Sequence, residues 1–205
     1  DTYLTDGTLK QAVADGYVLV ERTTESGVRL GIVGLIDLDD YDFDPKKKTL
    51  IRATEGTVIS RIPPRVKIRE NAAIELPHVM LLVDDPIDRQ KIDGCQGASQ
   101  EDAVNIAAVK HGIIEYVYAI RDTLRKLYDT ELMQGGGHIR GYAVEGEAAR
   151  KVTEAFAAKQ NSCGGFLFAV GDGNHSLATA KTCWENIKKS GKFTEEQLKT
   201  HPARH

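Results

Sequence analysis

The clearest pattern of hydrophobic and polar positions runs from Gly165 to Lys189. Residues 165–170 form an almost wholly apolar run, which has the length of one buried strand and is too short for an independent helix. A polar segment with two glycines follows, residues 171–176, and apolar residues then recur at helical spacing: Leu177, Ala180, Trp184 and Ile187. The stretch therefore predicts a buried strand, a tight turn and an amphipathic helix, which Gly191 ends.

The same patterns predict the remaining elements. Apolar positions at helical spacing, with prolines at one helix start, predict helices over 8–15, 63–73, 120–132 and 147–159. Alternating or continuous apolar runs predict strands over 17–22, 28–38, 49–52, 78–83 and 139–144. We expect turns at 25–27 and 46–48, the second a hairpin tip, a loop over 88–100, a short helix over 102–110, and a strand or helix start over 113–120. These elements indicate an α/β (α+β) fold with a small mixed β-sheet and packed helices, in a single domain over 1–205.

Composition narrows the class of protein. The 205 residues include 41% hydrophobic and 28% charged residues, enough for a buried core and an ordinary polar surface. A net charge of −3 argues against a general nucleic-acid binder, and no run has the length of a membrane span. Three cysteines far apart in sequence, Cys95, Cys163 and Cys183, fit reduced thiols. We expect a cytoplasmic protein, and the ends of the sequence suggest a fragment of a longer chain.

The turn at 171–176 is the first candidate site. A glycine-containing turn from a buried strand into a helix presents backbone N–H groups and the positive end of the helix dipole, which suits an anion such as phosphate. The alternative is structural, with Asp172 or Asn174 serving only as a helix cap. His175 beside Asp172 favours chemistry, because a cap does not require an acid and an imidazole in one turn.

Glu55 is the second candidate. It follows a predicted strand, and three arginines lie nearby in sequence: Arg52, Arg61 and Arg65. A carboxylate in that position suits a general base beside a phosphate-binding cluster. The alternative is that Glu55 forms a surface ion pair with one of these arginines. Two other segments favour plain loops, namely the acidic residues over 37–44 and the three glycines over 135–137, although the glycines also fit a ligand loop or a lid hinge.

Several of these pieces also occur together in one known family. The chain contains Asp172-Gly173-Asn174-His175 before a helix, LIRATEGT at 50–57, IPPR at 62–65, and LYD at 127–129 with three glycines at 135–137. In this combination, which spans residues 29 to 205, the sequence resembles the bacterial domain-of-unknown-function family 1015, within the ParB/sulfiredoxin-like superfamily. It differs from the family pattern at Thr54, where a His is more common, and at Ser176, where an Arg usually follows the His.

The resemblance implies a nucleotide-binding phosphotransferase, because the superfamily includes free-serine kinases that use a Glu and this turn. The small-molecule acceptor would carry a hydroxyl group, and the cofactors would be ATP or ADP with Mg²⁺. Glu55, Asp172 and His175 would then be the catalytic residues. The cofactor would be held by Gly173, Asn174, Ser176, Thr57, Arg65 and Arg52.

Other functions stay open at the level of sequence. A nucleotide-gated, ParB-like binding module would use the same turn without small-molecule catalysis, although a basic helix-turn-helix segment is absent. A metal-dependent hydrolase using His78, His138 and His175 is less favoured, because none of the three lies at metal-ligand spacing from another, and we expect no metal site. The chain lacks both the Walker loop and the protein-kinase motifs. We expect no nucleic-acid or membrane partner, and the sequence does not indicate an oligomeric state.

Overall fold

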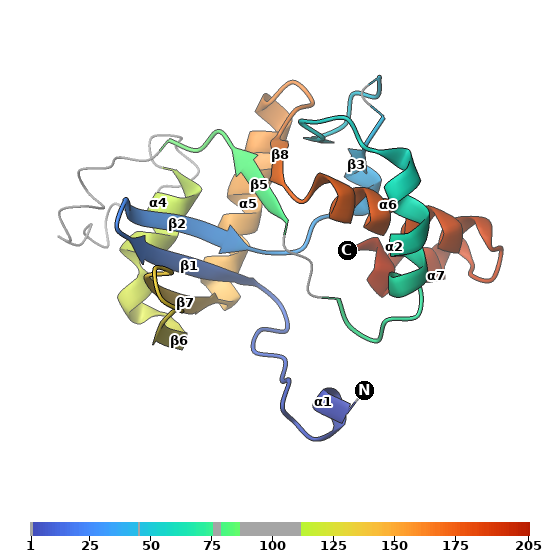
Figure 1. Ribbon diagram of the computed structural model, residues 1–205. Helices are drawn as coiled ribbons and strands as arrows, with labels where there is room; N and C mark the ends of the chain where they lie inside the picture. The colour runs from blue at the N-terminus through green and yellow to red at the C-terminus, as the bar shows by residue number, and fades with distance from the viewer. Residues whose placement is uncertain (1, 45, 76–78, 87–111) are drawn as a thin grey trace. The chain divides into compact units, whose positions relative to one another are not determined.

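The computed structural model describes residues 2–44, 46–75, 79–86 and 112–205. The chain forms two compact units, each built from two separate stretches of sequence (Figure 1). The first unit comprises Asp1–Gly34 and Asp85–Lys159, and the second comprises Leu35–Asp84 and Gln160–His205. Each unit has its own four-stranded sheet and its own hydrophobic core, so each can be described by itself.

The first unit contains an antiparallel sheet with the strand order β2-β1-β7-β6. Its strands are β1 (Tyr17–Thr24), β2 (Gly27–Val33), β6 (Arg125–Glu131) and β7 (His138–Val144). A tight turn joins β1 to β2, in which Thr24 pairs with Gly27, as the sequence predicts. The alternation of side chains along β1 buries Leu19 and Glu21.

Two helices cover one face of this sheet, α4 (Ile113–Ala119) and α5 (Gly146–Ser162). Val117 of α4 and Val152 of α5 pack with Leu19 and Val144 of the sheet, and all four side chains are fully buried. The carboxylate of Asp85 accepts the N–H groups of Ile113 and Ile114 at 3.0 Å and so satisfies the first turn of α4. The remaining short elements of this unit are α1 (Thr2–Thr5) and η5 (Arg121–Thr123).

The second unit contains a mixed sheet with the strand order β3-β4-β8-β5. Its strands are β3 (Tyr41–Asp42), β4 (Ile51–Arg52), β5 (Met80–Val83) and β8 (Phe168–Asp172). The strands β3, β4 and β8 run parallel to one another, and β5 pairs antiparallel with β8. This unit confirms the predicted small mixed sheet with packed helices, and the α+β class of the chain is confirmed with it.

The helix α6 (Asn174–Lys189) supplies most of the helical part of the second core. Leu177 and Trp184 of α6 pack against Val170, Ile51 and Tyr41 of the sheet. The indole N–H of Trp184 donates to a carboxylate oxygen of Asp39 at 2.8 Å, so the buried indole keeps a hydrogen-bond partner. The other helical elements of the unit are η1 (Leu38–Asp40), η2 (Ile59–Arg61), α2 (Ile62–Arg69), α7 (Glu195–Lys199) and η6 (Pro202–Arg204).

Three of the predicted elements are wrong. The segment 8–15 is not a helix; the nearby helical turn, α1, ends at Thr5. The side chains of 8–15 are mostly exposed, so no packing stabilises a helix there. The segment 120–132 is a 3-10 turn followed by β6, because pairing with β7 overrides the helical spacing of Leu124, Leu127 and Tyr128. Residues 46–48 do not form a hairpin tip, since β3 and β4 run parallel.

Other boundaries shift by a few residues. The strand expected over 28–38 ends at Val33, and the helix expected to reach Ala73 ends at Arg69. The segment 113–120 is a helix. His78, Cys95 and the predictions for 88–110 lie outside the described residues, whereas Cys163 and Cys183 are free thiols. Within the part of the chain that is described, none of the helices is both long and apolar enough to cross a membrane.

An ionic network joins three strands of the first sheet around His138. Its Nδ1 lies 2.7 Å from a carboxylate oxygen of Glu131, and its Nε2 lies 2.5 Å from one of Asp129. Arg140 donates to Asp129 at 3.2 Å and to the buried Glu21 at 2.6 Å. Because both ring nitrogens face carboxylates, hydrogen bonds to Glu131 and Asp129 raise the pKa of His138. Hydrogen bonds from Lys126 and His138 lower the pKa of Asp129.

We predict that replacing His138 with Asn lowers stability in a pH-dependent way. A raised imidazole pKa stabilises the fold fully below the unfolded value of about 6.5, and this contribution is lost as the pH rises through the folded value. The lowered Asp129 pKa acts in the opposite direction, and its contribution is lost only in strong acid. The difference in melting temperature between wild type and variant should therefore be largest near pH 5 and should shrink toward pH 9. A difference that stays constant over this range would show that the ring is not held as an imidazolium.

Candidate functional site

The parallel pairing of β4 with β8 positions the candidate site. Ile51 pairs with Phe168 and Arg52 with Ala169, so the two strands end at the same edge of the sheet. The segment 54–58 leaves β4 at this edge, and the segment 173–176 leaves β8 at the same edge to begin α6. Loops at the carboxyl ends of neighbouring parallel strands commonly carry the ligand site of an α/β sheet.

The turn between β8 and α6 leaves the helix start without a side-chain cap. Gly173 is the N-cap residue and has a φ of +89°, a left-handed conformation that favours glycine. The Asp172 carboxylate accepts the N–H of Gly173 at 2.7 Å and does not reach further into the helix. Among the described residues, no side chain makes a capping hydrogen bond to the start of α6, so Asp172 and Asn174 do not act here as the caps of the structural alternative.

Two hydrogen bonds tie the segment after β4 to the β8–α6 turn. The Thr54 N–H donates to the side-chain oxygen of Asn174 at 3.3 Å, and the Thr54 hydroxyl donates to the Val170 carbonyl at 2.6 Å. Asn174 is only 4% exposed, so its amide is a fixed part of the interior. These bonds determine where the chain leaves β4, and they therefore position the next residue, Glu55.

His175 lies between the two segments. Its Nε2 accepts the N–H of Val58 at 3.2 Å, which requires that this nitrogen carry no proton. The neutral ring then carries its proton on Nδ1, which lies 3.8 Å from a carboxylate oxygen of Glu55. The Glu55 side chain is 61% exposed and His175 is 17% exposed, so the acid reaches solvent and the imidazole is largely held by its neighbours.

The arginines near Glu55 have different surroundings. Arg52 donates to the carbonyls of Thr49 at 3.0 Å and Gly165 at 3.1 Å, and its guanidinium lies 4.5 Å from the centre of the Phe166 ring. Arg61 and Arg65 are exposed and make no ion pair with any described residue. Glu55 approaches His175 and, within the described ranges, none of the three arginines, so the surface ion pair expected as its alternative is not formed.

Thr57 and Ser176 complete the predicted set. The hydroxyl oxygen of Thr57 is buried and has no hydrogen-bond partner in the described parts of the chain. The carbonyl of Ser176 accepts from Arg69 at 2.7 Å, and Arg69 also forms a two-point ion pair with Glu75. The structure thus brings Glu55 close to His175 of the turn and leaves Thr57 next in sequence to Val58, which binds the same His175. Arg52 instead contacts backbone carbonyls and the Phe166 ring.

Sequence reasoning missed Thr54, Val58 and Arg69. Each contacts the β8–α6 segment through hydrogen bonds to residues more than 100 positions away, at Val170, Asn174, His175 and Ser176. Two of these bonds use backbone N–H groups, which every residue except proline has, so residue type gave no signal for them. Arg69 is visible as one more cation of a predicted helix, but its role depends on packing of α2 against α6.

Two other predicted features lie in the first unit. The glycines over 135–137 join β6 to β7, where a side chain at Gly137 would meet the Thr23 carbonyl and Arg22 donates to the Gly136 carbonyl. These contacts support the plain-loop interpretation. His138 is bound to carboxylates in that unit, which does not favour the metal-hydrolase alternative. No group of three or more His, Cys, Asp or Glu side chains among the described residues could hold a metal.

The fold and the site define a mixed α+β protein with a strand–turn–helix motif facing a strand-end carboxylate. A family model described as "Protein of unknown function (DUF1015)" matches residues 1–125 and 104–205, and together these matches cover the whole chain. The chain therefore belongs to this family. No curated protein and no solved structure matches it.

We predict that Asn174→Ala lowers the free energy of unfolding by about 1–3 kcal/mol, because it leaves the Thr54 N–H without its acceptor and removes a buried amide. Chemical denaturation of the variant measures this loss. Asn186→Ala is the matched control, since Asn186 is an exposed residue of the same helix. Equal stability of the two variants would mean that the bond between Thr54 and Asn174 does not form.

We predict that Thr57→Val leaves stability unchanged or raises it by up to about 1 kcal/mol, because it removes a buried hydroxyl that has no described partner. Thr54→Val is the comparison, since it removes the hydroxyl bonded to Val170 and should cost about 1 kcal/mol. Urea unfolding of both variants provides the measurement. A loss for Thr57→Val as large as that for Thr54→Val would show that the Thr57 hydroxyl has a partner in the folded protein.

Proposed function

We propose that this protein is a nucleotide-binding phosphotransferase that transfers a phosphoryl group to a small molecule carrying a hydroxyl. The observation that carries the proposal is the placement of Glu55 beside His175 at the start of α6, a helix that no described side chain caps. The resemblance to the ParB/sulfiredoxin-like superfamily, which includes free-serine kinases, points to the same chemistry. ATP or ADP would serve as the phosphate donor, with Mg²⁺.

The start of α6 suits the phosphate groups of the donor. Backbone N–H groups of the first helical turn and the helix dipole both favour an anion. Gly173 has no side chain to obstruct the approach of a phosphate, and its left-handed conformation turns the chain sharply into the helix. Positioning and electrostatic stabilisation supply most of the catalysis in phosphoryl transfer, and backbone groups at this turn can provide both.

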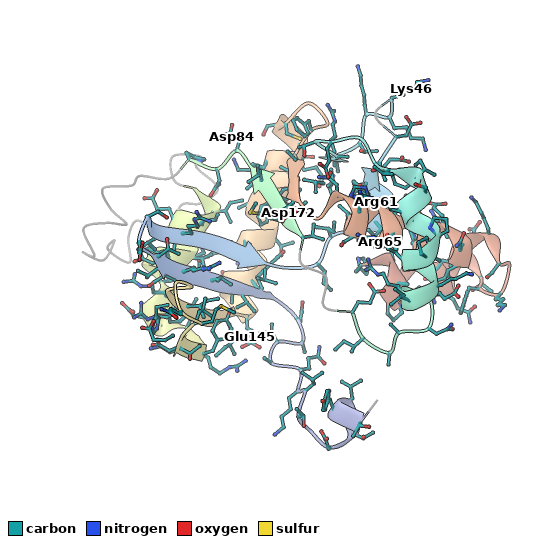
Figure 2. The ribbon with its side chains drawn as sticks, in the orientation of Figure 1. Lys46, Arg61, Arg65, Asp84, Glu145 and Asp172 are labelled. Carbon is teal, nitrogen blue, oxygen red and sulfur yellow. The ribbon has the colours of Figure 1, made fainter. Side chains whose placement is uncertain are left out.

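The two carboxylates of the site have different roles in this proposal. Glu55 is exposed enough to meet an acceptor and accepts the hydroxyl proton while the acceptor oxygen bonds to the terminal phosphorus. The phosphorus–oxygen bond to the leaving nucleotide breaks in the same step. Asp172, whose carboxylate lies at the end of β8, would be a ligand for Mg²⁺, an ion that proteins commonly hold with one or two carboxylates plus substrate phosphates (Figure 2).

His175 has a positioning role in this scheme. Because Nε2 accepts the Val58 N–H, the ring fixes the segment that carries Glu55 relative to the helix start. Its Nδ1 lies 3.8 Å from a carboxylate oxygen of Glu55, and in this scheme the ring would also face the phosphate groups of the donor.

We predict that ATP or ADP with Mg²⁺ stabilises the wild-type protein in a thermal-shift experiment. A ligand at ~100 times its dissociation constant adds roughly 2.7 kcal/mol to the free energy of unfolding. CTP and pyrophosphate test whether the base or only the phosphates are recognised. Glu55→Gln should keep this shift but lose ~10²–10⁴-fold in phosphoryl transfer to serine-like acceptors, because it lacks a base. Glu70→Gln, an exposed glutamate at the end of α2, is the matched control.

The possible outcomes are distinct. No stabilisation by any nucleotide would contradict the proposal as a whole. Stabilisation without transfer to any hydroxyl compound would contradict the phosphotransferase activity and favour the nucleotide-gated, ParB-like binding module. Full transfer activity in Glu55→Gln would exclude Glu55 as the base.

A further inference from the structure

The five arginines of the second unit fall into two groups. Arg52, Arg69 and Arg204 each have fixed partners: two backbone carbonyls for Arg52, Glu75 and the Ser176 carbonyl for Arg69, and Asp37 for Arg204. Arg61 and Arg65 are exposed and pair with no described carboxylate. Two guanidinium groups on one short helix are thus available for an anion from outside the chain.

The helix α2 is held against the start of α6 near both of its ends. Before α2, the Val58 N–H donates to His175, and Arg61 follows after one 3-10 turn closed by a 3.0 Å bond from its N–H to the Val58 carbonyl. At the far end, Arg69 donates to the Ser176 carbonyl at 2.7 Å. The intervening segment packs along α6 and buries Ile62. Its position relative to the β8–α6 turn is therefore determined by contacts on either side.

The spacing of the arginines places the free pair in one row with Arg69, which contacts α6. Arg61, Arg65 and Arg69 follow one another at intervals of four residues, and such residues form a row along one side of a helix. The last member of this row contacts the first turn of α6. Arg61 and Arg65 lie one turn apart, about 6 Å along the axis, which suits two neighbouring phosphate groups. Figure 2 labels Arg61 at the residue before α2, Arg65 on α2 and Asp172 at the end of β8.

We propose that Arg61 and Arg65 bind the distal phosphates of a nucleoside di- or triphosphate whose other phosphate groups lie at the start of α6. This inference rests on the proposed function and names the residues that select a polyphosphate over a monophosphate. Guanidinium groups bind phosphate through paired N–H donors, which gives orientation as well as charge. The chain as a whole has a net charge of −3, so the attraction for a polyanion depends on these local cations.

Three apolar side chains of the same segment, 58–68, are exposed. Val58, Ile59 and Ile68 are 44%, 62% and 78% exposed, although branched aliphatic residues are usually buried. Ile68 lies on the same side of α2 as Arg61 and Arg65 by helical spacing. A ligand with a flat apolar base and a charged tail complements this surface better than inorganic phosphate alone, which supports a nucleotide as the occupant.

The test is calorimetric binding of ATP, ADP, AMP and pyrophosphate, each with Mg²⁺, to wild type and to the double variant Arg61→Gln/Arg65→Gln. Glutamine keeps an unbranched polar side chain of similar helix propensity and removes the charge. We expect the double variant to bind ATP, ADP and pyrophosphate at least tenfold more weakly, and AMP with little change. Its affinity should also depend less on salt, because fewer cations contact the ligand. Lys67→Gln is the matched control, since this exposed lysine lies on α2 outside the arginine row.

The outcomes separate this inference from the proposed function. If wild type and the double variant bind ATP with equal affinity, the proposed role of the arginines is overturned, whereas the nucleotide site itself is not. An equal loss in Lys67→Gln would show only a general effect of charge, and it would also overturn the inference. A wild-type protein that binds none of the four compounds would overturn both. The melting temperature of each variant establishes that it is folded.

Discussion

The parallel pairing of β4 with β8 is the constraint on which the candidate site depends. The two strands are far apart in sequence, and one is only two residues long, yet their pairing makes both carboxyl ends meet at one edge of the sheet. The backbone pairing of this short strand is supplemented by two further hydrogen bonds, which Thr54 donates to the β8–α6 segment. This pairing is what brings Glu55 and His175, which are distant in sequence, close together in the fold.

Some polar side chains of the second unit belong to its core, and others lie on the segment that follows β4. Two polar side chains that face the core have partners, the Trp184 indole with Asp39 and the buried Lys181 with the Leu38 carbonyl, whereas the buried Tyr41 hydroxyl has none among the described residues. An unpaired buried polar group is costly, so most of these groups are satisfied. On the described segment after β4, the side chains of Thr57, Arg61 and Arg65 have unused hydrogen-bonding capacity. All three lie on the stretch 57–65, which runs from the loop after β4 into α2, and such a grouping suits a ligand site.

The first unit has a different chemical character. Its prominent charged cluster, around His138 and Asp129, is internally neutralised by carboxylates and cations on neighbouring strands. Such a network stabilises the pairing of three strands and leaves little capacity for an external ligand. The contrast supports assigning the candidate chemistry to the second unit, where Arg61 and Arg65 are exposed and pair with no described carboxylate.

The sequence by itself determined the elements whose pattern is strong. The β8–turn–α6 segment, the β1–β2 hairpin and helix α5 all lie close to where their apolar periodicity and turn residues predict them, since these signals are local. Residue type also singled out Glu55 and the turn at 172–176. Tertiary structure decided the rest: β6 is a strand because β7 pairs with it, and Arg52 is bound by carbonyls while Arg61 and Arg65 remain exposed. These outcomes depend on contacts between residues distant in sequence, and no local pattern encodes which of several equivalent side chains will find a partner.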